Sequence, residues 1–90
     1  MSNYIDWHDL TETEQALANK IITDAMDHVI CKFHTFELQI DNVLYQYEMS
    51  CYNQSNVTLH NPIGLDENEY EVDCEWWKIE QYVNQYLNQL

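Results

Sequence analysis

Hydrophobic side chains recur every three or four residues after Thr11, which is the period of a helix with one apolar face. Thr11 and Glu14 have the spacing of a capping box, in which each side chain accepts a hydrogen bond from the other residue's backbone N–H. The apolar positions are Leu17, Ala18, Ile21, Ile22, Ala25, Met26, Val29 and Ile30. The sequence therefore predicts a long N-terminal helix over residues 12–32.

The period changes to two after this helix, as is typical of half-buried strands. The alternating stretches that predict strands are residues 36–40, 44–51 and 56–60. Tyr45 and Tyr47 are expected to share the core face of the second strand. Asp41-Asn42 is a turn candidate between the first two strands, and Asn61-Pro62-Ile63-Gly64 is expected to end the third.

Acidic residues then occupy every second position for nine residues. They are Glu67, Glu69, Glu71, Asp73 and Glu75. Residues i and i+2 of a strand lie on one face, about 6.6 Å apart. A fourth strand over residues 68–74 would carry a row of carboxylates outward, with Tyr70 and Val72 as its anchors to the interior.

Helical spacing of apolar residues returns at Trp76 and predicts a C-terminal helix that runs to the end of the sequence. Trp76 and Trp77 are adjacent, so a helix cannot bury both equally. The sequence thus predicts one small α+β domain over residues 1–90. Its element order is α-β-β-β-β-α, with both helices packed on an antiparallel sheet of three to four strands.

Composition supports a folded chain and an extreme charge. Of 90 residues, 46% are hydrophobic and only one is glycine and one proline, which argues against a disordered acidic tail. Sixteen Asp and Glu face three Lys and no Arg, for a formal charge of −13. Nucleic acid and anionic membranes are poor partners for such a surface, whereas a basic protein surface is a good one.

Catalytic and cofactor chemistry find little support in the sequence. Cys31, Cys51 and Cys74 lie in no recognisable nucleophile motif, and a single glycine excludes a glycine-rich phosphate loop. We therefore expect no enzymatic activity and no cofactor. The cysteines are expected to be reduced thiols, and the absence of an apolar leader or a membrane-spanning run predicts a cytoplasmic protein.

Two stretches of the sequence suggest a metal site, and each has a simpler structural explanation. Asp24, His28 and Cys31 share one face of the first predicted helix, with His34 just beyond, but no zinc motif accompanies them, and a surface Asp24–His28 pair is the favoured alternative. The stretch that begins at Asp66 resembles a calcium loop but lacks its later ligands and glycine. We expect no metal site.

The acidic row and the overall charge resemble those of the DNA-mimic inhibitors encoded by bacteriophages, which include anti-CRISPR and anti-restriction proteins. This resemblance implies a non-enzymatic, stoichiometric inhibitor whose carboxylates stand in for phosphates in the basic cleft of a nucleic-acid-binding protein. The expected target is a CRISPR effector, or else a restriction or repair enzyme. The expected contact residues are Glu67, Glu69, Glu71, Asp73, Glu75, Asp24, Asp27 and Trp77.

Two alternative functions remain open at this point, as does the oligomeric state. The acids can serve solubility alone, as on many solvated edge strands. The protein can be an acidic adaptor that binds another protein through an exposed aromatic patch, with Trp77 as an anchor. The sequence allows either a monomer or a homodimer.

Overall fold

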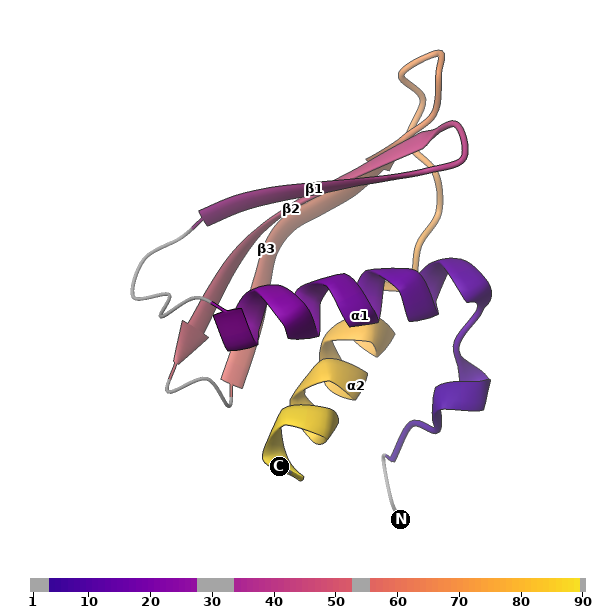
Figure 1. Cartoon of the computed structure of the whole chain (residues 1–90). Helices are drawn as coiled ribbons and strands as arrows, with labels where there is room; N and C mark the ends of the chain where they lie inside the picture. The colour runs from indigo at the N-terminus through magenta and orange to yellow at the C-terminus, as the bar shows by residue number, and fades with distance from the viewer. Residues whose placement is uncertain (1–3, 28–33, 53–55, 90) are drawn as a thin grey trace.

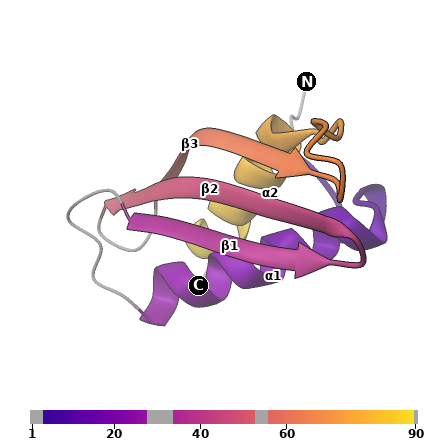
Figure 2. The same ribbon diagram turned by 90° about the horizontal axis from the view of Figure 1, so that it is seen from above.

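The computed structural model of the chain describes residues 4–27, 34–52 and 56–89. Its elements are η1 (Trp7–Asp9), α1 (Glu12–Asp27), β1 (His34–Ile40), β2 (Val43–Tyr52), β3 (Asn56–Leu65) and α2 (Trp76–Asn88). The strands form an antiparallel sheet in the order β1-β2-β3, and both helices lie on one of its faces (Figures 1 and 2). The predicted α+β class is confirmed, with three strands.

The predicted capping box starts α1. The Thr11 N–H donates to Glu14 Oε1 at 2.8 Å, and the Glu14 N–H donates to Thr11 Oγ1 at 3.2 Å. Leu17, Ile21 and Ala25 lie on the face of α1 that is fully buried. The predicted extension of this helix over residues 28–32 lies outside the described residues.

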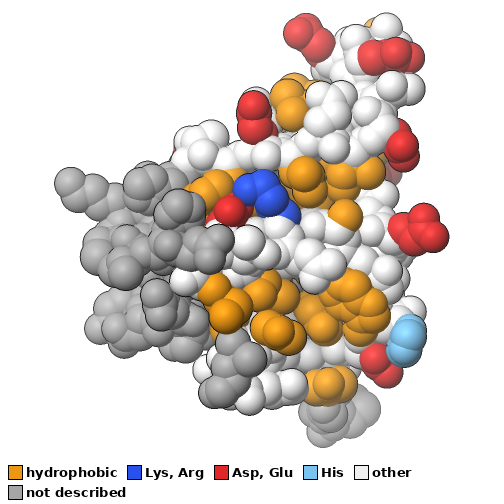
Figure 3. All heavy atoms as spheres, in the orientation of Figure 1, with side chains coloured by type: hydrophobic (Ala, Val, Ile, Leu, Met, Phe, Trp, Pro, Cys, Tyr) orange, Lys and Arg blue, Asp and Glu red, His pale blue; other side chains and the backbone are white. Residues whose placement is uncertain are grey.

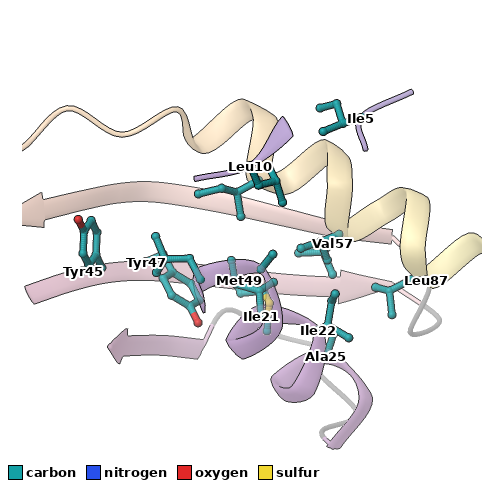
Figure 4. Close-up of a cluster of buried hydrophobic side chains, with 14 residues drawn as sticks. Ile5, Leu10, Ile21, Ile22, Ala25, Tyr45, Tyr47, Met49, Val57 and Leu87 are labelled. Atoms are coloured by element: carbon teal, nitrogen blue, oxygen red, sulfur yellow. The ribbon is translucent and has the colours of Figure 1, made fainter. Parts of the chain in front are cut away.

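Tyr45, Tyr47 and Met49 alternate along β2 and are all buried between the sheet and the helices (Figure 4), as predicted for the two tyrosines. The predicted turn at Asp41-Asn42 joins β1 to β2, and Asp41 adopts a φ of 55°. Aspartate tolerates this left-handed conformation better than most residues. Local sequence signals therefore predict the β1–β2 hairpin correctly.

The prediction that Asn61-Pro62-Ile63-Gly64 ends the third strand is wrong, because β3 continues to Leu65. The pairing with β2 shifts between Gln46 and Glu48, where two β3 residues face one β2 residue. This β-bulge contains Asn61, with φ of 51°, and accommodates a proline that cannot donate to the ladder. The breaker residues thus bend β3 without ending it.

The chain's single glycine has a packing role in β3. Gly64 pairs with Tyr45 across the sheet, and a Cβ at Gly64 would come within 2.8 Å of the Tyr45 ring. Any larger residue would displace that buried ring. Glycine here therefore allows the close approach of a side chain, so its presence does not signal a loop.

The predicted fourth strand does not form. Residues 66–75 follow β3, and within them only Glu71 makes a bridge, to Leu65. Alternation of exposed and half-buried side chains persists from Glu71 to Glu75 because this extended stretch has one side against the protein. Alternation requires only an extended chain with one covered side, and it does not require the hydrogen bonds of a sheet.

The C-terminal helix α2 forms as predicted and buries Ile79, Val83 and Leu87. Trp76 packs against the rings of Tyr45 and Tyr47, with centroid separations of 6.0 Å for both. Trp77 points outward and is 65% exposed. The expectation that the two tryptophans have different environments is therefore confirmed.

Side chains of α2 also bond to the N-terminal arm and to the outer edge of β3. Gln85 bonds the backbone N–H and carbonyl of Ile5, each at 2.8 Å. Asn84 accepts from the Val57 N–H at 2.7 Å and donates to the Val57 carbonyl at 3.0 Å. Glu80 accepts from the Leu59 N–H at 2.8 Å. These polar side chains anchor α2 to both neighbours.

Candidate functional site

The acidic segment, residues 66–75, begins with a turn organised by one carboxylate. Asp66 Oδ1 accepts from the backbone N–H groups of Asn68, at 2.8 Å, and Tyr70, at 2.9 Å. Backbone hydrogen bonds from Glu69 to Asp66 and from Asp66 to Tyr70, both 2.9 Å, close the same turn. Asp66 forms an Asx-type turn of the kind that aspartate favours. The turn residues are therefore held in place without a sheet.

The second half of the acidic segment is fixed to β3 and to the start of α2. The Val72 N–H donates to the Gly64 carbonyl at 2.8 Å, and the Trp76 N–H donates to the Cys74 carbonyl at 2.9 Å. Val72 and Cys74 are half-buried. The five predicted contact acids of the segment, Glu67, Glu69, Glu71, Asp73 and Glu75, are all exposed.

Tyr70 corrects one detail of the sequence analysis. It was expected to anchor a strand to the interior, but it is 71% exposed. The reason is that Tyr70 closes the Asp66 turn through its backbone, which leaves the ring free to point away from the protein. An exposed tyrosine therefore lies among the carboxylates. The preceding Asp-Glu-Asn run is a turn signal that could have indicated this.

Few positive charges compensate these acids. Lys78 Nζ lies 3.7 Å from Glu75 Oε2 and 3.9 Å from Glu14 Oε1, and donates to the Asp9 carbonyl at 2.6 Å. Lys20 pairs with Asp24 at 2.6 Å. Within the described residues, Glu67, Glu69, Glu71 and Asp73 form no ion pair. Their negative charge is therefore available to a partner.

The start of α1 extends the acidic surface. Lys78 joins the acidic segment to Asp9 in η1 and to Glu14 in α1, and Asp6, Asp9 and Glu12 are exposed there. The segment descends past this end of α1 (Figure 1), and acidic side chains follow the same edge of the molecule (Figure 3). The contact residues expected from the sequence do not include these acids of the helix start.

Asp24 does not belong to that surface. It is only 8% exposed, and its Oδ2 accepts hydrogen bonds from Lys20 Nζ at 2.6 Å and from the buried Tyr47 hydroxyl at 3.4 Å. It also lies about 18 Å along the helix from Glu12, at 1.5 Å per residue. Asp24 is therefore an internal hydrogen-bond acceptor. The side chain of Asp27, the other predicted α1 contact, lies outside the described residues.

An open cavity of about 540 Å³ separates the acidic segment from the start of α1. Its lining residues are Thr11, Thr13, Glu14, Tyr45, Val72, Asp73, Cys74, Glu75 and Lys78. Burial, together with the charges of Glu14 and Glu75, raises the pKa of the Cys74 thiol to about 11. The thiol is uncharged at neutral pH, whereas the thiolate is the nucleophilic form. Among the described residues, no histidine lines this cavity to act as its base.

Metal ligands do not gather in the part of the chain that the structure describes. No group of three or more His, Cys, Asp or Glu side chains there could hold a metal ion. Of the candidate metal ligands on the first helix, the Asp24 carboxylate binds Lys20 and Tyr47. His28 and Cys31, and the side chain of His34, lie outside the described residues.

Comparison with known proteins returns no match to this chain, whether to a family model, to a curated protein or to a solved structure. The resemblance to phage DNA mimics therefore stays a prediction based on charge. Among the described residues, no helix combines the length and the apolar character that crossing a membrane demands.

Proposed function

We propose that this protein is a non-enzymatic, stoichiometric inhibitor that binds the basic nucleic-acid-binding surface of a target protein. The observation that carries the proposal is the set of exposed carboxylates on the acidic segment, four of which (Glu67, Glu69, Glu71 and Asp73) form no ion pair among the described residues. The backbone that carries them is fixed by hydrogen bonds. A CRISPR effector is the leading target, followed by a restriction or repair enzyme. Such a role places the protein in the cytoplasm, with its target.

The physical basis is charge mimicry of a phosphate backbone. Proteins that bind nucleic acid line their clefts with Lys and Arg, which neutralise phosphates. Carboxylates meet the same side chains, and Arg binds a carboxylate through two parallel hydrogen bonds. Because Asp66 and Gly64 already hold the backbone of the acidic segment, binding loses less conformational entropy than it would with a flexible tail. The exposed Tyr70 adds a ring that can stack on a guanidinium.

The decisive experiment compares two charge reversals of equal size. Glu67→Lys with Glu71→Lys changes the acidic segment, and Glu37→Lys with Glu48→Lys makes the same change in charge on the sheet. Binding to purified CRISPR effectors, restriction enzymes and repair enzymes is measured by calorimetry, with and without competing DNA. We expect the first pair to reduce affinity by about 100-fold or more, as loss of close interfacial charge pairs does.

The second pair is expected to have a much smaller effect, and DNA is expected to compete with the protein for its target. Affinity should also fall steeply with salt. Equal losses in the two variants would mean that only total charge matters. Binding that neither salt nor DNA weakens would contradict the proposal.

A second candidate function is an acidic adaptor that binds another protein through aromatic side chains. Trp77 and Tyr70 favour it, because both are large, exposed rings, and Tyr70 lies within the acidic segment. Trp77→Ala separates the two functions. An adaptor loses its partner on this change and keeps it after Glu67→Lys with Glu71→Lys, whereas the proposed inhibitor shows the opposite order of effects.

A further inference from the structure

The two outer edges of the sheet differ in how their backbone groups are satisfied. On β3, the outward groups of Val57 and Leu59 bond to Asn84 and Glu80 of α2. Further along, the Gly64 carbonyl accepts from the Val72 N–H of the acidic segment at 2.8 Å. The edge of β3 is thus covered along most of its length.

The edge of β1 has no such cover among the described residues. A two-residue turn joins Ile40 to Val43, so Ile40, Leu38 and Phe36 direct their backbone groups to β2. Thr35, Glu37 and Gln39 therefore direct theirs outward. The bonds that cover β3 obey the same alternation, since Leu59 lies opposite Met49, which pairs with His34 of β1, and Val57 is two residues before Leu59.

No described residue donates to, or accepts from, these outward groups of Thr35, Glu37 and Gln39. Unpaired backbone groups in a row are a template for another strand. Figure 2 shows β1 at one edge of the sheet and β3 at the other. The open edge therefore lies across the sheet from the acidic segment and is a separate surface.

Side chains on the two sides of the open edge indicate what would fit there. On the face away from the helices, Glu37 is exposed and Glu48 is half-buried, and no lysine is seen there among the described residues. On the helix side, Leu38 and Ile40 are half-buried and pack on the core. A strand placed beside β1 would thus meet carboxylates on one face and apolar side chains on the other.

We propose that the edge of β1 accepts an extended cationic segment of a partner protein as a fourth, antiparallel strand. The segment alternates Lys or Arg, facing Glu37, with apolar residues that cover Leu38 and Ile40. Charge selects this occupant over a second copy of the chain, because each copy carries −13. Pairing two β1 strands about Glu37 would also place like charges opposite each other, which is destabilising.

The probe is a blocked peptide of alternating lysine and valine, as long as β1, added to the full chain. Amide hydrogen exchange is followed residue by residue by NMR. At saturation, exchange at Thr35, Glu37 and Gln39 is expected to slow by about tenfold or more, because their N–H groups become bonded. Val57 and Leu59, whose N–H groups are already bonded, are the internal controls and are expected not to change.

Two peptide variants test the strand geometry. In an antiparallel pair, the peptide residues opposite Thr35, Glu37 and Gln39 are the lysines. The backbone N–H groups of these lysines point at β1. Methylation of the lysine backbone nitrogens is therefore expected to abolish binding, and methylation of the valine nitrogens to preserve it. Any other result overturns antiparallel addition at this edge.

Two protein variants separate this surface from the acidic segment. Glu37→Lys is expected to weaken peptide binding by about tenfold, whereas Glu67→Lys, the same change in charge elsewhere, is expected to have little effect. Equal losses of peptide affinity in the two variants would show that the peptide is attracted by total charge alone, and would overturn the proposal. Slower exchange confined to the acidic segment would overturn it as well. Slow exchange at Thr35, Glu37 and Gln39 without peptide, in a protein of dimer mass, would mean that a second copy fills the edge.

Discussion

This protein has two groups of carboxylates. Those inside the fold accept hydrogen bonds from other parts of the chain, whereas those on the acidic segment are exposed to solvent. Asp24 accepts hydrogen bonds from Lys20 and the Tyr47 hydroxyl, and Glu80 accepts one from the Leu59 N–H. Glu67 and Glu69 lie in solvent with no cation beside them among the described residues. The chain has three lysines and no arginine, so its inner acids rely largely on N–H and O–H donors.

This difference separates acids that stabilise the fold from acids that are available for binding. Removal of an inner acid leaves a donor without an acceptor, which costs free energy. Removal of an outer acid relieves repulsion in a chain of charge −13. Unfolding measurements on matched variants can therefore assign each carboxylate to one group or the other.

The largest effect is expected at Asp24. Asp24→Ala leaves the buried Tyr47 hydroxyl and the Lys20 ammonium without their acceptor, so the free energy of unfolding should fall by about 2 kcal/mol. Glu67→Ala is the matched control, with an expected change within about 0.5 kcal/mol. Urea titrations at pH 7 measure both.

A double-mutant cycle sharpens this prediction. Tyr47→Phe removes the hydroxyl that Asp24 accepts, so Asp24→Ala should cost less in the Tyr47→Phe background than in the native chain. Equal costs in the two backgrounds would mean that Asp24 acts through Lys20 alone. Equal costs of Asp24→Ala and Glu67→Ala would remove the distinction between inner and outer acids.

Glu80 is expected to show the next largest effect. Glu80→Ala leaves the Leu59 N–H at the edge of β3 without its acceptor and should cost about 1 kcal/mol of unfolding free energy. Glu80→Gln keeps an acceptor oxygen and removes the charge, so it should preserve most of the stability. Hydrogen exchange at Leu59 should quicken in the alanine variant only. Faster exchange in both variants would show that charge, rather than the acceptor, matters.

Sequence reasoning found the elements whose signals are local. The Thr11–Glu14 capping box, the Asp41-Asn42 turn and the alternation of Tyr45 and Tyr47 each depend on residues a few positions apart. The acidity and exposure of the segment from Glu67 to Glu75 could also be predicted, because they follow from composition and spacing.

Features that depend on distant partners could not be predicted. Asp24 is buried because it meets Tyr47, which is 23 positions away in the sequence. The side chains of the acidic segment alternate as in a strand, but the bond that ties its backbone to β3 is the one from the Val72 N–H to the Gly64 carbonyl. The bulge at Asn61 keeps a proline inside β3, against the local signal for a break.

A smaller effect is expected from the pH dependence of stability at Cys74, which lies between a buried acid and an exposed one. Glu14 and Glu75 both face Cys74, and with burial they raise the pKa of its thiol from 9.0 to about 11. Between these values the folded chain holds more protons than the unfolded chain, so stability should fall as pH rises. In Cys74→Ser the loss over pH 9–11 should be smaller than in the native chain.

Urea titrations at pH 8, 9, 10 and 11 measure that loss for both proteins. Tyr47 contributes in the same direction in each, since burial and Asp24 raise the pKa of its hydroxyl above 10.0. It therefore cancels in the comparison. Parallel curves for the native and Cys74→Ser chains would mean that the thiol carries no such linkage.

The smallest effect is expected from the outer acids themselves. Glu67→Gln with Glu69→Gln removes two like charges without removing a hydrogen bond found among the described residues, so stability should rise by about 0.5 kcal/mol or less at low salt. Salt screens exposed charges, so the gain should vanish at about 1 M NaCl, where the Debye length is about 3 Å. A loss of stability at low salt would place these two carboxylates among the inner acids, and their negative charge would then not be free for a partner.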